Sequence, residues 1–331
     1  MERRGKHDVD ERMADLAYAA GWTLVRRSPE SAGRAVFRRI ADRSWRAHDA
    51  GTRGLERNLR RLVGPHATDA QLRALSKAGM RSYMRYYYEL FRLPAMGREH
   101  ILSHTRQSGV EVLEEHVRSG RGVVAALPHM GNWDHAGAWI AARGTPLTTV
   151  AQRLRPESLY RRFTSYRESL GMEVLPLTGG ANTVGVLARR LREGGLMCLL
   201  ADRDINGNGL EVDFFGEKAR MPSGPAALAL NTGAALMPVS LWYEGPYWNI
   251  RVHEEVPVAE GASRAARVQE TTRALARVFE GAIAEHPEDW HMLQAVFSAD
   301  HDQDRARRRE IEAAARSGID SSNETPRGRG R

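Results

Sequence analysis

A histidine and an aspartate, His129 and Asp134, are five residues apart and directly follow the apolar run 122–128. The run is typical of a short buried strand, and residues 133–142 are typical of the helix after it. Ligands of open α/β sheets bind where strands end and helices begin. Asp134 can hold one imidazole nitrogen so that the other accepts a proton from a hydroxyl. The pair predicts acyl transfer to an alcohol, although the same spacing also suits a structural hydrogen-bonded pair.

A second polar group follows the apolar segment 196–201, where Asp202, Arg203 and Asp204 stand in sequence. If this strand neighbours the first, these side chains lie near the His129 loop. We expect Asp202 to help position either His129 or an acceptor. A developing oxyanion needs hydrogen-bond donors, and Arg203 or backbone N–H groups near Gly131 and Asn132 are candidates. Alternatively, the acidic residues only make a loop soluble.

Arginines mark the segment 152–168 as a basic entry to a helix. Arg153, Arg155 and Arg167 can hold the phosphates of a nucleotide-bearing thioester or of a phospholipid head group. An exposed arginine face without a ligand is the alternative. The single cysteine, Cys198, falls in an apolar strand and is assigned to packing. No metal site is expected, because the residues around His129 do not keep the spacing of a metal-hydrolase motif.

Helix and strand patterns alternate from about residue 108, which predicts an α/β fold with a mostly parallel central sheet flanked by helices. The turn at 244–246 predicts that the last two strands are antiparallel. We divide the chain into an N-terminal helical, membrane-associating region (1–95), an α/β core (96–300) and a polar, partly disordered tail (301–331). The expected strands are 122–127, 147–151, 172–176, 196–201, 235–242 and 247–253, and the expected helices are 108–119, 133–143, 156–169, 183–193, 223–232 and 263–285.

Basic charge is concentrated at the N-terminus. The net charge is +8, and residues 1–63 hold 15 basic against nine acidic side chains, which accounts for +6 of it. Such a segment can attract an anionic membrane surface. No apolar run is long enough for a membrane span, and residues 13–25 are better read as an interfacial helix with Leu16, Tyr18 and Trp22 at the lipid boundary. A nucleic-acid-binding module is a competing class, but no nucleic-acid motif is present and no nucleic-acid partner is expected.

An ordered series of motifs resembles the bacterial lipid A late acyltransferases, a lysophospholipid acyltransferase-like family, and within it the phosphatidylinositol mannoside acyltransferases. The similarity covers roughly residues 10–300. It rests on His129-x4-Asp134, Ala201-Asp-Arg-Asp204, Val212-Asp-Phe-Phe-Gly216, Met221-Pro-Ser-Gly-Pro-Ala226 and Thr232-Gly-Ala-Ala-Leu-Met-Pro238.

The resemblance implies transfer of a fatty acyl chain from acyl-CoA, with palmitoyl-CoA the expected donor, to a mannose hydroxyl of a phosphatidylinositol mannoside. The enzyme is expected to be a peripheral monomer at the cytoplasmic face of the inner membrane, with acyl-CoA as co-substrate and no cofactor. Another glycolipid or a lysophospholipid is the alternative acceptor. Three positions depart from some relatives, which carry Glu where Gln152, Asp202 and Asn231 stand. The implied catalytic residues are His129, Asp134 and Asp202, and the implied substrate-binding residues are Asn132, Gln152, Arg153, Arg167, Arg203 and Asn231.

Overall fold

The computed structural model describes residues 21, 23–152, 157–176, 183–205 and 207–301. Their centre is a seven-stranded sheet in which all neighbouring strands are parallel except β8 and β9, which are antiparallel as predicted. The strands lie side by side in the order β1 (Thr105–Ser108), β9 (Tyr247–Val252), β8 (Ala235–Glu244), β2 (Val123–Leu127), β5 (Leu196–Leu200), β3 (Leu147–Ala151) and β4 (Met172–Pro176). The predicted α/β class is confirmed.

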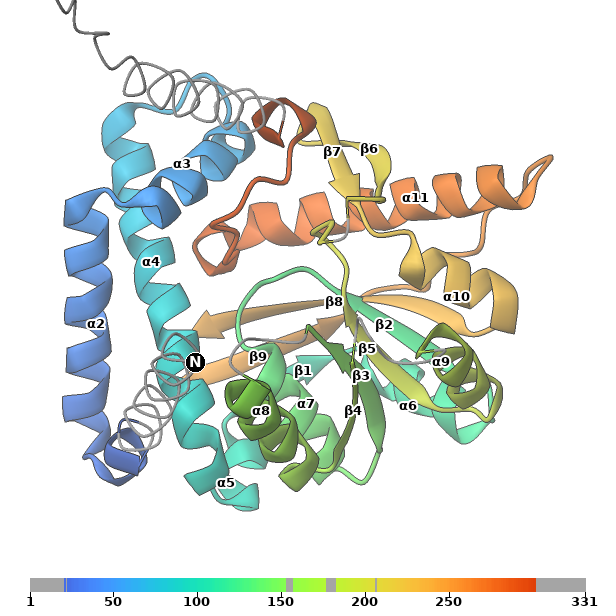
Figure 1. Cartoon of the computed structure of the whole chain (residues 1–331), viewed down its shortest axis with the longest axis horizontal. Helices are drawn as coiled ribbons and strands as arrows, with labels where there is room; N and C mark the ends of the chain where they lie inside the picture. Colours follow the sequence, from blue (N-terminus) through green and yellow to red (C-terminus); the bar gives the residue numbers. More distant parts are fainter. Residues whose placement is uncertain (1–20, 22, 153–156, 177–182, 206, 302–331) are drawn as a thin grey trace, which may run out of the picture.

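Helices cover both faces of this sheet (Figure 1). One face packs against α6 (Val110–Arg118) and α7 (Trp133–Ala142), and the other against α9 (Thr183–Arg192), α10 (Gly224–Thr232) and α11 (Arg264–Glu285). The helix α8 (Glu157–Ser169) packs on the edge strand β4. The two faces follow from right-handed crossovers, because the chain moves along the sheet in one direction through α6, α7 and α8 and returns through α9 and α10.

The N-terminal region is helical where the structure describes it. It comprises α2 (Glu30–Ala47), α3 (Ala50–Val63) and α4 (Asp69–Arg92), followed by η1 (Leu93–Ala95) and α5 (Arg98–Ser103). Leu55, Leu59 and Met80 form a small core between these helices. In Figure 1, α2 and α4 run alongside each other at the edge of the molecule. The predicted interfacial residues Leu16, Tyr18 and Trp22, and the tail from residue 302, lie outside the described residues.

Two features were not predicted. The short strand β1 has no apolar run, and β6 (Leu210–Phe214) pairs with β7 (Glu217–Met221) as a separate antiparallel hairpin. Both turn residues of the hairpin, Phe215 and Gly216, have positive φ, of 48° and 77°. Two adjacent positive φ angles match the right-handed twist of a hairpin. A short 3-10 turn, η2 (Pro287–Asp289), follows α11.

The helix α3 packs against the segment that follows η2 and holds it by hydrogen bonds. Asn58 donates to the carbonyls of Met292 and Gln294, at 2.7 and 2.9 Å. Gly54 leaves room for this contact, because a Cβ there would lie 1.9 Å from the carbonyl oxygen of Leu293. The close approach of α3 to the chain beyond α11 therefore depends on a glycine at position 54.

We expect Gly54→Ala to lower the free energy of unfolding by about 1–3 kcal/mol, the usual cost of overpacking. Gly281→Ala is the matched control: Gly281 is also helical, but a Cβ there meets nothing within 4 Å. The control should gain about 0.5–1 kcal/mol, since alanine favours a helix over glycine. Urea denaturation of both variants provides the measurement, and equal stability of the two would contradict this packing.

Candidate active site

An apolar cavity of about 370 Å³ lies between the sheet and the helices α6 and α7. Side chains alternate between the two faces of a strand, so every second residue of β2, β5 and β3 points into it. Residues 113, 140 and 252 extend its wall beyond the central strands. The residues contributed by the three strands are Ala125 and Leu127; Leu196, Cys198 and Leu200; and Leu147, Thr149 and Ala151, with Val150 of β3 as an exception to the alternation.

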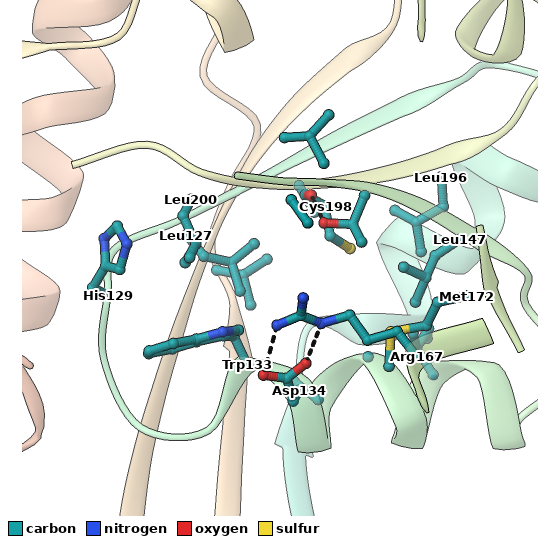
Figure 2. Close-up of a pocket in the computed structure, with 18 of the residues that line it drawn as sticks. Leu127, His129, Trp133, Asp134, Leu147, Arg167, Met172, Leu196, Cys198 and Leu200 are labelled. Atoms are coloured by element: carbon teal, nitrogen blue, oxygen red, sulfur yellow. Dashed lines mark hydrogen bonds and ion pairs between the residues drawn. The ribbon is translucent and has the colours of Figure 1, made fainter. Parts of the chain in front are cut away.

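One end of this cavity is polar. His129, Arg203 and Asp204 line it there, together with Gln152 and Asn208. Gln152 and Asn208 are exposed, so this end opens to solvent. In Figure 2, His129 stands at one side of the apolar wall, while Leu147, Leu196 and Met172 line the other side. The cavity therefore offers a mostly apolar interior, interrupted by the ion pair of Asp134 and Arg167, with His129 at its polar end.

His129 forms a dyad with Asp202. Because β2 pairs with β5, the residues that follow these two strands are neighbours. Nδ1 of His129 lies 2.5 Å from Oδ1 of Asp202, and the backbone N–H of His129 donates to Oδ2 at 2.9 Å. Burial of Asp202 opposes its ionisation, but the adjacent imidazole of His129 and the hydrogen bonds from His129 and Trp290 outweigh it and lower the pKa of this carboxyl. An ionised carboxylate only accepts, so Nδ1 carries a proton and Nε2 is left to accept one.

Asp134 does not orient His129, and that expectation is corrected. Its carboxylate accepts hydrogen bonds from Arg167, at 2.6 and 3.1 Å, and from the Tyr86 hydroxyl at 2.8 Å. Figure 2 shows the Trp133 side chain between His129 and this ion pair. The physical reason is helical geometry: Asp134 is in the first turn of α7, whose side chain at that position faces α4 and α8 instead of the β2 loop.

The other predicted site residues divide into two groups. Arg203, Gln152 and Arg167 line the cavity as expected of residues that meet a substrate. Asn132 does not: it is 4% exposed, caps α7 by accepting from the His135 N–H at 2.9 Å, and donates to Glu89. Asn231 is also separate from the cavity, since its side chain accepts from Arg264 on α11. Arg153 and Arg155 lie outside the described residues.

Comparison with known proteins identifies the family. The model of the bacterial lipid A biosynthesis acyltransferases matches residues 2–298. A protein of Mycolicibacterium smegmatis named phosphatidylinositol mannoside acyltransferase is 47% identical over 309 residues, which cover 93% of this chain and 99% of that protein. Two proteins of the same name from strains of Mycobacterium tuberculosis are 45% identical over 305 residues, 91% of this chain and 93% of theirs. The chain belongs to the family of bacterial lipid A biosynthesis acyltransferases. It is an acyltransferase.

In this acyltransferase, Cys198 has no suitable protonation state for a nucleophile. Its thiol lines the apolar wall of the cavity, and burial raises its pKa to about 12. The thiolate is the reactive form of cysteine, so this environment disfavours Cys198 as a nucleophile, and its assignment to packing stays a prediction. Within the described ranges, no group of three or more His, Cys, Asp or Glu side chains could hold a metal ion.

The segment 289–291 was missed by the sequence reasoning. The Trp290 indole N–H donates to Oδ2 of Asp202 at 2.9 Å, and the backbone N–H of His291 donates to the His129 carbonyl at 2.7 Å. Asp289 ends the short 3-10 turn η2, and Trp290 and His291 follow it without strand or helix periodicity. A tryptophan beside a histidine among polar residues was the only signal.

We expect Asp134→Ala to destabilise the acyltransferase by about 3–5 kcal/mol, because it leaves the charge of Arg167 buried without its partner. The double variant Asp134→Leu with Arg167→Met should recover most of this loss, since an apolar pair replaces the ion pair. Thermal and urea unfolding of the three proteins measure the effect. If Asp134→Ala unfolds like the wild type and yet loses its activity, Asp134 acts on the chemistry and the structural assignment is wrong.

Proposed function

We propose that this acyltransferase moves a fatty acyl chain from acyl-CoA to a mannose hydroxyl of a phosphatidylinositol mannoside. One observation carries the proposal: an apolar cavity ends at the dyad of His129 and Asp202. Such a cavity suits a hydrocarbon chain whose reactive head must stop beside a base. The printed names of the three relatives favour phosphatidylinositol mannoside as the acceptor.

The acyl chain of the donor occupies the cavity in this proposal. Each methylene removed from water contributes about 0.8 kcal/mol, so a long chain binds through many small gains along the strands β2, β5 and β3. The thioester then lies at the polar end, beside His129 and Arg203. The nucleotide part of CoA extends into solvent from there, where arginine can bind phosphate. We expect palmitoyl-CoA to be a good donor.

The reaction proceeds by direct transfer. Nε2 of His129 accepts the proton of the mannose hydroxyl as its oxygen attacks the thioester carbonyl, and Asp202 stabilises the imidazolium that forms. Arg203 is the candidate donor to the resulting oxyanion. When the tetrahedral intermediate collapses, the C–S bond breaks and the imidazolium returns its proton to the CoA thiolate. The products are the acylated lipid and CoA, with no acyl-enzyme between them.

Membrane access follows from the substrates. Fatty acyl-CoA and phosphatidylinositol mannoside are both amphiphiles, so the enzyme meets them at a lipid surface. Among the described residues, no helix has the length and apolar character to cross a bilayer. We propose peripheral attachment at the cytoplasmic face, where the excess of arginine in residues 1–63 meets anionic lipid.

His129→Ala should lower acyl transfer by about 10²–10⁴-fold, the usual contribution of a general base. The assay incubates palmitoyl-CoA with phosphatidylinositol mannoside, a lysophospholipid or another glycolipid, and identifies the lipid product by mass spectrometry. His116→Ala, on α6 and outside the cavity lining, is the control and should keep wild-type transfer. Substantial transfer by His129→Ala would disprove the assignment of the base, and preference for the lysophospholipid would disprove the acceptor.

Cys198→Phe tests the cavity as the acyl site. The larger ring occupies space beside Ala125, its neighbour across the β2–β5 pairing. Transfer from palmitoyl-CoA should fall at least tenfold relative to transfer from decanoyl-CoA, because losing even two methylene contacts costs about 1.6 kcal/mol. Cys198→Ala removes the thiol without filling the cavity and should transfer both chains normally. An unchanged chain preference in Cys198→Phe would place the acyl chain elsewhere.

A further inference from the structure

The segment 289–291 lies directly against the loop that carries His129. Besides the His291 to His129 hydrogen bond, the backbone N–H of Gly131 donates to the Asp289 carbonyl at 2.9 Å, and Met130 and Trp290 form an isolated antiparallel bridge. These backbone contacts fix the loop on both sides of Met130, directly after His129. The loop after β2 is therefore held like a short strand, although no sheet extends there.

Trp290 is buried, as are its neighbours Asp289 and His291. Its side chain is 0% exposed, and it is absent from the cavity lining, so it does not meet the proposed substrates. Its indole N–H instead donates to Asp202, whose carboxylate is also 0% exposed. A buried carboxylate needs a donor for each oxygen that its catalytic partner does not occupy, since an unpaired buried charge is costly.

The donors to Asp202 come from both sides of the site. Oδ1 faces Nδ1 of His129, while Oδ2 accepts from the His129 backbone and from Trp290. Without the indole N–H, both remaining donors belong to His129, and only its backbone N–H would still hold Oδ2. Trp290 provides the only one of these three hydrogen bonds that is independent of the residue being oriented.

From this geometry we propose that Trp290 is a positioning residue for the transfer reaction, whose indole N–H fixes the Asp202 carboxylate and, through it, the imidazole of His129. The proposal rests on the proposed function, because it assigns His129 and Asp202 to the chemistry. It predicts that the rate of transfer depends on the indole N–H group, and not only on the volume of the ring. Trp290 touches no reacting atom and acts entirely through Asp202.

The first test compares Trp290→Phe with the wild-type full-length chain, using palmitoyl-CoA and phosphatidylinositol mannoside. The kcat should fall about tenfold or more, the size expected for one hydrogen bond to a charged group. The KM for the donor should stay within twofold, since Trp290 does not line the cavity. The acid limb of the pH–rate profile should move to higher pH, because a carboxylate that loses a donor holds the imidazolium proton more tightly.

A second variant separates the N–H from ring packing. Replacement of Trp290 by β-(3-benzothienyl)alanine keeps the bicyclic shape and exchanges the N–H for sulfur. It should reproduce the lower kcat and the shifted acid limb while its thermal unfolding matches the wild type. Trp45→Phe is the matched control: the Trp45 indole N–H donates to Ser76 at 3.0 Å between α2 and α4, away from the cavity, and its loss should change neither kcat nor the pH profile.

A double-mutant cycle completes the test. In the background of Asp202→Asn, Trp290→Phe should cost little further activity, because the charge it serves is already gone. Full additivity of the two losses, or wild-type kinetics in the benzothienyl variant, would overturn the positioning role and leave Trp290 as packing. Failure of the proposed function gives a different result: His129→Ala would remain active, or the wild type would not acylate the lipid.

Discussion

The structure around the polar end of the cavity depends on one buried carboxylate. Asp202 has no exposed surface, and a buried carboxylate is costly unless it accepts hydrogen bonds, so the protein has to surround it with donors. Those donors come from chain segments far apart in sequence, at His129 and Trp290. The hydrogen bonds to the Asp202 carboxylate thus join the end of β5, the loop after β2 and the segment beyond α11. The relative positions of these three segments determine the geometry of the site.

The rest of the site follows from the alternation of side chains along the strands. One face of β2 and β5 supplies Ala125, Leu127 and Cys198 to the cavity, while the intervening residues pack against α9–α11 on the other face. Polar groups are concentrated where these strands end. The ends of parallel strands thus place an apolar wall and a group of polar side chains side by side.

The sequence predicted where chemistry should lie better than which residues perform it. The strands 147–151 and 172–176 agree with the observed bounds, and both polar ends, at His129 and Asp202, lie in one site. The assignment of Asp134 failed because spacing along the chain does not reveal the direction of a side chain in the first turn of a helix. Leu127 pairs with Leu200, which puts residues 129 and 202 at matching distances past the strand ends. That register depends on the order of the strands in the sheet, which a single sequence does not reveal. The hydrogen bond from Trp290 to Asp202 depends on the same strand order.

The helix α4 shows why the N-terminal region matters to the chemistry, beyond any contact with a membrane. Ser82, Tyr86 and Glu89 are spaced four and three residues apart, so they lie on one face of α4. Each serves a different part of the site: Ser82 contacts His291 at 2.8 Å, Tyr86 donates to Asp134, and Glu89 accepts from Asn132. All three are buried. A division of the chain at residue 95 stays a prediction, but one polar face of α4 already contacts the end of the His129 loop, the first turn of α7 and the segment 289–291. Separating α4 from the core would leave these groups without partners, and the two regions therefore depend on each other for a formed site.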